Sequence, residues 1–291
     1  MHFAFLVPAP DYPDPWDWAF DVQADALRKR GVGVDAVRWT SGEDLSGYDL
    51  VLPLVVWGYH LRYAEWLQFL DSIEAAGLPI VNPPALLRWN SDKAYLSELS
   101  NKGVAAIPTL GADSLGEEDL ARAADLFGTG ELVVKPPVSA SASGTHRVRV
   151  GDPIPPDERG QRMLIQPFLP AIASEGEYGI MLFDGQYSHA VVKRPKSGDF
   201  RVQPSLGGSS QSGEAPSEAI ELARSALSAA PTRTTYARVD VLRAPDGAFH
   251  VMEMELIEPA LFLDGNARAE ERFVNAVLAA AELAKARSPL V

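Results

Sequence analysis

The sequence predicts an α/β protein that begins with a parallel α/β domain and continues with two α+β subdomains. Strand-like and helix-like segments alternate over residues 1–85, as expected for a parallel sheet whose strands are joined by helices. The stretch YDLVLPLVVWGY, residues 48–59, is almost continuously apolar, which is typical of a strand buried on both faces. Later strands come in pairs around Asp-Gly, a dipeptide that favours tight hairpin turns.

The first domain is expected to span residues 1–85 and to hold four strands and two helices. Both predicted helices stop at a glycine, which adopts the left-handed conformation of a helix end without strain. The predicted strands are HFAFLV (2–7), VGVDAV (32–37), YDLVLPLVVWGY (48–59) and LPIVNP (78–83). The predicted helices are Trp18 to Arg30, before Gly31, and Tyr63 to Ala76, before Gly77.

A central subdomain is expected at 86–165 and a C-terminal subdomain at 166–291. Their predicted strands are LVVK (132–135), RVRV (147–150), MLIQPFLP (163–170), a hairpin over 175–195, YARVDVL (236–242) and VMEMEL (251–256). Their predicted helices are 94–102, one that ends at Leu126, 219–230 and 266–286. The loop-rich stretch 197–217 is too long for a plain connection, and this length indicates a functional loop.

The composition argues against several classes of function. A net charge of −13 disfavours nucleic-acid binding, which calls for a basic surface. The absence of cysteine excludes disulfides and thiolate metal sites. No apolar run is long enough to cross a bilayer, and HFAFLV lacks the basic region of a signal peptide. We therefore expect a cytoplasmic protein with neither nucleic-acid nor membrane partners.

The acidic strand VMEMEL is the most informative stretch of the sequence. Alternation places Glu253 and Glu255 on one face together with Val251, which by itself is the ordinary pattern of a half-exposed strand. If Asp246 and Gly247 form a two-residue loop, the preceding strand pairs with it in a fixed register. Counting back from that loop places Asp240 opposite Glu253, and Arg238 opposite Glu255.

Such a pairing would bring the carboxylates of Asp240, Glu253 and Glu255 together beside a single arginine. Like charges on directly opposed strand residues destabilise a sheet. A hard divalent cation with oxygen ligands would relieve the repulsion, so the register predicts a metal site. A loop of odd length would break this argument.

Lys135 leaves the apolar strand LVVK and is followed by the small-residue loop Ser139–Thr145. A lysine in that position can hold phosphates as a point charge, and small side chains let backbone N–H groups surround an anion. A strand-end lysine that merely reaches solvent is the alternative. Neither G-x-x-x-x-G-K-[ST] nor a complete dinucleotide motif is present.

The densest basic cluster of this acidic chain, Lys193 to Arg201, precedes the turn Gly207-Gly208-Ser209 in the same loop. An arginine beside a Gly-Gly turn favours a grip on a carboxylate or a phosphoryl group. A solvated run of charge is the alternative.

Two further segments are candidates for ligand contact. Gln166-Pro167-Phe168 joins the two halves of the chain and either presents an edge to a purine ring or serves as a plain connector. Trp57, Tyr59 and His60 follow the third strand, where open α/β sheets place ligands. A structural role at a domain interface is the alternative for these three residues.

Taken in order, these segments resemble the ATP-grasp superfamily of ligases, with glutathione-synthetase-like architecture. VVWGYH (55–60) and VNPPALLRWNSDK (81–93) extend the resemblance to the bacterial subgroup that includes the cycloserine-forming cyclo-ligase. Each motif is weak alone, and their order makes the match specific. The other matching motifs are VVKP (133–136), LIQPFLP (164–170), EGEYGIMLFDGQYSHAVVKRP (175–195), GDFRVQ (198–203), GG (207–208), ARVD (237–240) and MEMELIEPALFL (252–263).

The resemblance implies an ATP-grasp fold whose two α+β subdomains grip ATP, and it assigns roles to particular residues. Those implied to bind ATP are Lys93, Lys135, Ser141, Ser143, Gly144, Thr145, Gln166, Pro167, Phe168 and Glu177. Those implied to be catalytic are Lys193, Arg201 and Arg238. The metal ligands would be Asp240, Glu253 and Glu255, and the substrate-binding candidates are Trp57, Tyr59, His60, Gly207, Gly208 and Ser209.

The implied activity is an ATP- and magnesium-dependent ligase, with manganese as a substitute metal. It would join a small amino-acid-like carboxylate to an amine or other nitrogen nucleophile through an acyl phosphate, or close a ring within one molecule. A homodimer is compatible with the resemblance. A nucleotide-binding module without turnover and an ATP-grasp phosphotransferase are the alternatives. Two departures bear on the substrate and the metal: Gly58 where relatives carry Asp, and Glu255 where many relatives carry Asn.

Overall fold

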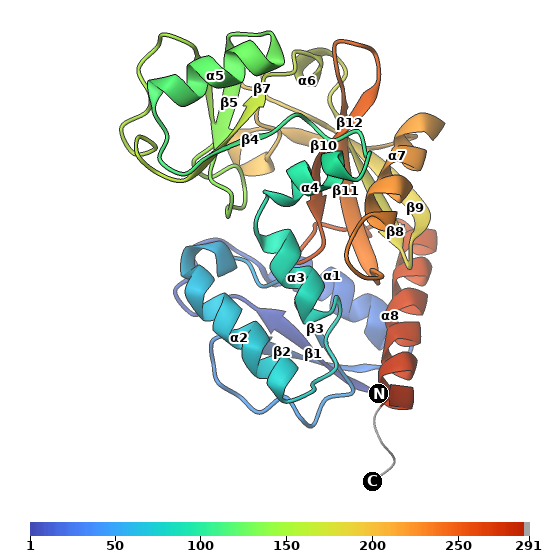
Figure 1. Ribbon diagram of the computed structural model, residues 1–291. Helices are drawn as coiled ribbons and strands as arrows, with labels where there is room; N and C mark the ends of the chain where they lie inside the picture. The colour runs from blue at the N-terminus through green and yellow to red at the C-terminus, as the bar shows by residue number, and fades with distance from the viewer. Residues whose placement is uncertain (288–291) are drawn as a thin grey trace.

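The computed structural model describes residues 1–287 and confirms a mixed α/β fold, here with three separate β-sheets (Figure 1). The first sheet is parallel, in the order β2-β1-β3. Side chains alternate along β1, so Phe3 and Phe5 enter the core beneath α1 while Leu6 enters the core beneath α2. The elements are β1 (His2–Val7), α1 (Asp17–Arg28), β2 (Gly33–Arg38), β3 (Leu50–Leu52), η1 (Tyr59–Arg62), α2 (Tyr63–Ala75) and α3 (Pro84–Ser91).

The predicted fourth strand, LPIVNP, is not a strand in the structure. It contributes a single isolated bridge between Ile80 and Val51. Pro79 and Pro83 lack the N–H groups that would extend this pairing. The third strand is likewise shorter than predicted, because Pro53 follows β3 directly.

The second sheet is antiparallel, in the order β4-β7-β5-β6, and α5 packs against it. Its elements are α4 (Tyr95–Asn101), which precedes the sheet, β4 (Leu110–Ala112), α5 (Glu117–Phe127), β5 (Glu131–Lys135), β6 (His146–Arg149) and β7 (Met163–Pro167). The predicted boundary at 165/166 falls inside β7, so this sheet extends two residues beyond it. The division into three domains stays a prediction.

The third sheet is antiparallel, in the order β10-β9-β8-β11-β12, and carries the acidic strand at its edge. The loop-rich stretch 197–217 holds a short helix and the edge strand β10. The elements are α6 (Ala171–Ser174), β8 (Glu177–Phe183), β9 (Gln186–Arg194), η2 (Pro204–Leu206), β10 (Ser209–Gly213), α7 (Ser217–Ser228), β11 (Tyr236–Arg243), β12 (Phe249–Glu255) and α8 (Ala267–Arg287).

The register of β11 and β12 is as predicted, although the turn between them is not. Ala248 O accepts a hydrogen bond from Ala244 N–H at 2.8 Å, which leaves a loop of three residues rather than two. The odd loop would shift the pairing by one position, but Met252 is an extra residue in a β-bulge and restores it. Arg238 therefore opposes Glu255, and Asp240 opposes Glu253, which confirms the predicted pairing.

Because of this bulge, Val251 lies on the opposite face of the strand from the one predicted. Val251 is fully buried in the core beneath the sheet, whereas Met252 and Glu253 border the cavity on the other face. An extra residue in a strand reverses the alternation on one side of it, and this explains the difference.

Helix α8 belongs to the end of the chain but packs against its beginning (Figure 1). Phe273 and Val277 of α8 share a buried core with Phe3, Phe5 and Leu27. The C-terminal helix therefore completes the core on one face of the first sheet.

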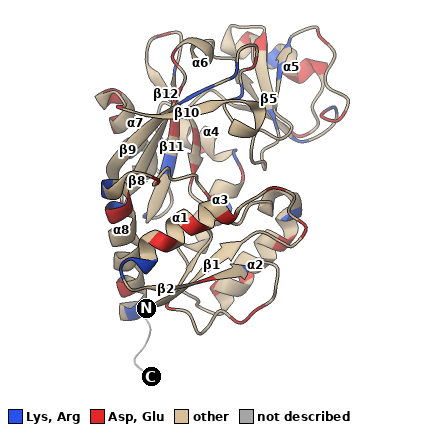
Figure 2. Ribbon diagram, turned by 180° about the vertical axis from the view of Figure 1, so that it is seen from behind, with Lys and Arg blue, Asp and Glu red and all other residues tan. Residues whose placement is uncertain are grey.

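None of the helices within residues 1–287 is long and apolar enough to cross a membrane. Figure 2 shows acidic and basic side chains interspersed on the outer helices α1, α5 and α8.

Candidate active site

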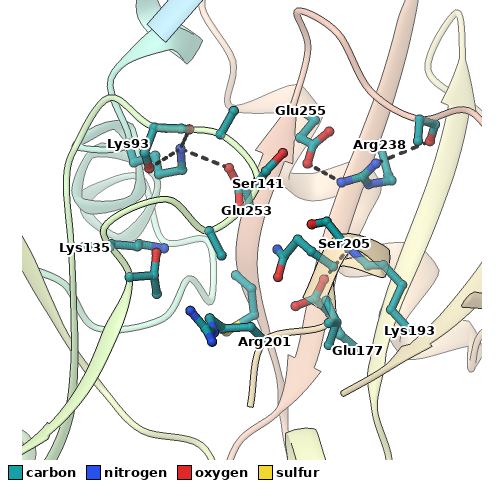
Figure 3. A pocket seen from close by; sticks show the side chains of 18 of the residues that line it. Lys93, Lys135, Ser141, Glu177, Lys193, Arg201, Ser205, Arg238, Glu253 and Glu255 are labelled. Carbon is teal, nitrogen blue, oxygen red and sulfur yellow. Dashed lines mark hydrogen bonds and ion pairs between the residues drawn. The ribbon is translucent and has the colours of Figure 1, made fainter. Parts of the chain in front are cut away.

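A cavity of about 600 Å³ lies where segments of all three sheets meet, and most of the predicted site residues border it (Figure 3). The bordering predicted residues are Trp57, Tyr59, His60, Lys93, Lys135, Ser141, Thr145, Gln166, Pro167, Phe168, Glu177, Lys193, Arg201, Arg238, Glu253 and Glu255. The predicted residues that do not border it are Ser143, Gly144, Gly207, Gly208, Ser209 and Asp240.

Asp240 lies beneath the cavity wall, where it is 3% exposed and bound by two cations. Arg238 Nε donates to its carboxylate at 3.0 Å, and Lys193 Nζ lies 2.7 Å from the other oxygen. Lys193 also pairs with Glu177. Burial raises the pKa of Asp240, but the charges of Arg238 and Lys193 outweigh burial and lower it below the ordinary value. Asp240 is thus a buried counter-ion of two cations whose side chains reach the cavity.

Glu253 and Glu255 project from β12 into the cavity, as Figure 3 shows. Glu253 lies 3.3 Å from Lys93 Nζ, and Glu255 pairs with Arg238. Burial raises the pKa of Glu255 to about 8. The pKa of Glu253 is lowered, because Lys93 and Lys135 outweigh the effect of burial.

The oxygen donors of Glu253 and Glu255 fit a hard divalent cation. No ready-made cluster of three metal-binding side chains is found among residues 1–287. The carboxylates are instead paired with lysine and arginine, so Mg²⁺ would have to displace these pairs.

Lys93 and Lys135 line the same cavity as these carboxylates, and Lys93 is in direct contact with Glu253. Lys93 is fixed by the loop after β5, because its ammonium group donates to the carbonyl oxygen of Ser139 and its backbone N–H to Pro137 O at 2.8 Å. Lys135 is 8% exposed and forms no salt bridge with any residue of the described part of the chain. Burial lowers the pKa of Lys135 to about 8. A buried, unpaired ammonium group is a site for an anion.

This pKa predicts how nucleotide affinity depends on pH. Because Lys135 loses its proton above about pH 8, the Kd for metal-free ADP should rise about tenfold per pH unit above that value. Lys135→Arg stays charged and should remove this part of the pH profile. Calorimetric titrations of both proteins between pH 7 and pH 10 measure the difference. If the Kd for ADP depended on pH in the same way in both proteins, Lys135 would not be the group that binds the phosphates.

Two aromatic rings border the cavity, that of Phe168 directly after β7 and that of Phe200 in the loop after β9. The ring of Phe168 lies edge-on to the ring of Phe200, with centroids 6.0 Å apart, and the guanidinium of Arg147 lies 3.8 Å from the Phe168 centroid. Gln166 is held by a hydrogen bond from its side-chain amide to Thr109 Oγ1 at 2.9 Å. These contacts fix an apolar surface suited to a planar ring.

The small-residue loop over the cavity takes an unusual backbone path. Ser141 and Ala142 both have positive φ, of 52° and 57°. This conformation is rare for residues with a side chain and turns successive N–H groups in a new direction. Ser141 and Thr145 reach the cavity, while Gly144 packs against Pro136 instead.

Arg201 is oriented by Asp199, whose two carboxylate oxygens accept from Arg201 Nε at 3.1 Å and from the terminal nitrogen at 2.9 Å. Gly207 and Gly208 do not border the cavity, and Gly208 is needed for the path of the backbone. A Cβ on Gly208 would lie 2.1 Å from Val202 O, so only glycine fits there. The same loop reaches the cavity through Ser205 and Ser210, two residues that the sequence did not single out.

Further cavity residues that sequence reasoning missed include Tyr12, Asp14, Trp18 and Glu258. Glu258 lies in the same acidic stretch as Glu253, and its charge was the available signal. The other three are in and beside the loop after β1. Carboxyl ends of parallel strands gather at one edge of a sheet, which is the signal that could have identified this loop.

The comparisons with known proteins support one family. Residues 5–82 match the family model described as the N-terminal domain of the D-cycloserine synthetase DcsG. The chain is 29% identical over 284 residues to the cycloserine biosynthesis protein DcsG of Streptomyces lavendulae, covering 90% of this chain and 94% of the relative. It is 32% identical over 221 residues to glutathione synthetase of Prochlorococcus marinus, covering 69% of this chain and 68% of the relative.

Solved structures of DcsG and of another ligase are also similar to this chain. The crystal structure of D-cycloserine synthetase DcsG matches with a TM-score of 0.83 at 26% identity, over 98% of this chain and 100% of that one. D-alanine–D-alanine ligase from Bacillus anthracis matches with a TM-score of 0.72 at 17% identity, over 99% and 100%. The second likeness shows a shared fold.

Proposed function

Because the chain belongs to the ATP-grasp superfamily of ligases, in the group related to glutathione synthetase, we propose that it joins the carboxylate of a small amino-acid-like substrate to a nitrogen nucleophile. It is an ATP-dependent ligase that forms C–N bonds. One observation carries the proposal. The buried cations Lys93 and Lys135 line one cavity together with the carboxylates of Glu253 and Glu255. That arrangement suits a polyphosphate and the cation it brings.

The proposed reaction has two steps. A substrate carboxylate oxygen attacks the γ-phosphorus of ATP, the bond to the bridging oxygen breaks, and ADP leaves with an acyl phosphate formed. The lone pair of the nitrogen nucleophile then attacks the acyl carbon, the C–O bond to phosphate breaks, and the nitrogen loses a proton. Little covalent chemistry falls to the protein in phosphoryl transfer, so its residues act by positioning and by charge.

Each group of cavity residues has a place in this scheme. Lys93 and Lys135 would hold the ATP phosphates, and Arg201 with Lys193 would face the transferred phosphoryl group. Glu253 and Glu255 would hold Mg²⁺, for which Mn²⁺ can substitute. The metal would polarise phosphate oxygens and orient the nucleotide. Asp240 is also proposed as a ligand, although its carboxylate would first have to leave two cations.

We further propose that the bond closes a ring within one substrate molecule. The similarity to DcsG over nearly the whole of both chains supports this version.

An ADP-release screen tests the function. D- and L-amino acids and their side-chain derivatives would be assayed with ATP and Mg²⁺, each with and without an added amine, and the products identified by mass spectrometry. We expect ADP release with at least one acid, and a product that has lost water relative to that acid alone. A product that always contains the added amine would contradict ring closure. ADP release by no carboxylate would contradict the proposed ligation.

Arg201 gives a prediction for the phosphoryl end of the cavity. Arg201→Leu should lower kcat about 100-fold, as for loss of one oriented donor to developing charge, with the Kd for ATP little changed. Asp199→Asn should cost less, since Arg201 keeps its charge and loses only its orientation. Arg194→Leu, at an exposed arginine on β9, is the matched control. Equal kcat values for the Arg201 and Arg194 variants would remove Arg201 from the mechanism.

A further inference from the structure

We propose that one end of the cavity binds a positively charged amino group of the substrate. This end consists of the carboxylates of Glu258 and Asp14 and the rings of Tyr12, Trp18 and Trp57, and we call it the ammonium subsite. The proposal rests on the proposed function, because it takes the cavity to be the site where the substrate acid reacts.

The other half-buried carboxylates of the cavity wall each pair with a cation, and Glu258 does not within residues 1–287. The three acidic side chains near the lysines each pair with a cation: Glu177 with Lys193, Glu253 with Lys93, and Glu255 with Arg238. Glu258 forms no salt bridge with any residue between 1 and 287. An ionised carboxylate removed from water without a counter-ion is costly. A ligand that brings a positive charge would supply the missing partner.

Asp14 lies on the same side of the cavity as Glu258. The pKa of Tyr12 is raised by burial and, in addition, by the negative charges of Asp14 and Glu258. Both carboxylates therefore act on one phenol group, although they come from opposite ends of the chain. Asp14 is exposed at the rim, and Glu258 lies deeper. An ammonium group entering from the rim would pass one carboxylate and reach the other.

The aromatic rings form a continuous wall beside these carboxylates. The centroids of Trp18 and Trp57 are 5.6 Å apart, and those of Tyr12 and Trp57 are 6.5 Å apart. Trp18 is 59% exposed, which is unusual for the largest aromatic side chain and leaves part of its surface open. Indole faces attract cations through the quadrupole of the ring. The wall therefore favours an alkylammonium group over a neutral hydroxyl of the same size.

Gly58 makes room for this wall. It has a φ of 85°, and a Cβ at this position would lie 2.8 Å from the Tyr12 ring. Any other residue would displace Tyr12. The glycine that departs from the expected sequence pattern is thus required by the aromatic wall of this chain.

The polarity of the cavity specifies the class of substrate. The cavity carries charges of both signs, because Lys93, Lys135 and Arg201 line it together with the carboxylates of the ammonium subsite. A small zwitterion fits with its carboxylate toward the ATP phosphates and its amino group toward Glu258. The structure thus favours amino acids over hydroxy acids and dicarboxylates.

A binding experiment tests the subsite without requiring turnover. Alaninamide and lactamide differ only in an ammonium group in place of a hydroxyl, and neither has a reacting carboxylate. Ligand-detected NMR titrations of the full chain with both enantiomers of each should give a Kd at least about tenfold lower for alaninamide. Glu258→Gln should abolish the preference, and Asp14→Asn should reduce it. Glu118→Gln, at an exposed residue of α5, should retain it. Equal Kd values for the two amides would overturn the proposal.

Kinetics separate failure of the subsite from failure of the function. With an acid found by the ADP-release screen, Glu258→Gln should raise KM for the amino acid about tenfold or more but leave KM for its hydroxy-acid analogue unchanged. Equal kcat/KM for the two acids with the wild type would overturn the subsite while the ligase function stands. No ADP release with any acid, together with a retained preference for alaninamide, would overturn the function while the subsite stands.

Discussion

Replacing Glu253 with glutamine is expected to lower turnover by about a thousandfold and to change the free energy of unfolding by less than about 1 kcal/mol. Glu253 projects into the cavity, its side chain is 32% exposed, and its one cation partner is Lys93 at 3.3 Å. Glutamine preserves the shape and a hydrogen bond to the ammonium group. It removes the charge that would bind Mg²⁺ with the nucleotide.

Binding and activity together test this role. In the wild type, Mg²⁺ should lower the Kd for ADP, and in Glu253→Gln that gain should disappear. Glu118→Gln should behave as the wild type in both assays. A variant that releases ADP at a near wild-type rate with saturating substrates would exclude Glu253 as a metal ligand.

Asp240→Asn is expected to lower the free energy of unfolding by about 3–5 kcal/mol at neutral pH, in addition to abolishing turnover. Asp240 balances Arg238 and Lys193 in a site that excludes water, so asparagine leaves two buried cations with less compensation. The structure predicts a less stable protein, since Asp240 is buried and not at the surface of the cavity.

Urea denaturation at pH 7 measures the difference. Asp184→Asn is the matched control, because it breaks an exposed ion pair with Arg233 and should cost at most about 1 kcal/mol. The pKa of Asp240 is lowered below its ordinary 3.8, so its stabilisation is fully present above that pH and is lost only in stronger acid. Equal stability of Asp240→Asn and the wild type at pH 7 would show that another group neutralises the two cations.

The α/β class and the strand pairs could be predicted from the sequence, because periodicity and turn residues act locally. The resemblance to ATP-grasp ligases identified most of the charged residues that line the cavity. The pairing of Asp240 with Glu253 was predicted for an incomplete reason. A three-residue loop and a bulge at Met252 each shift the register by one position, and the two shifts cancel. Neither irregularity has a unique local signal, so both were missed.

Other features of the site could not be predicted because they depend on contacts between distant parts of the chain. The burial of Asp240 depends on where the side chains of Lys193 and Arg238 lie, which strand periodicity does not specify. The sequence predicts a substrate-binding role for Gly207 and Gly208, whereas in the structure Gly208 is required because it lies against the backbone of Val202. The charges of Asp14 and Glu258 both raise the pKa of Tyr12, after burial, although the two carboxylates are far apart in the chain. Only the folded molecule shows that convergence.

The packing of α8 against the first sheet has a consequence for biosynthesis. Phe273 and Val277 supply part of the interior that contains Phe3 and Phe5, so residues 1–85 lack part of their core until α8 has been translated. Residues 1–85 cannot reach their final state on the ribosome before the C-terminal helix emerges. A nascent chain stalled before residue 267 should thus leave residues 1–85 sensitive to protease, and synthesis past residue 287 should protect residues 1–85 and α8 together.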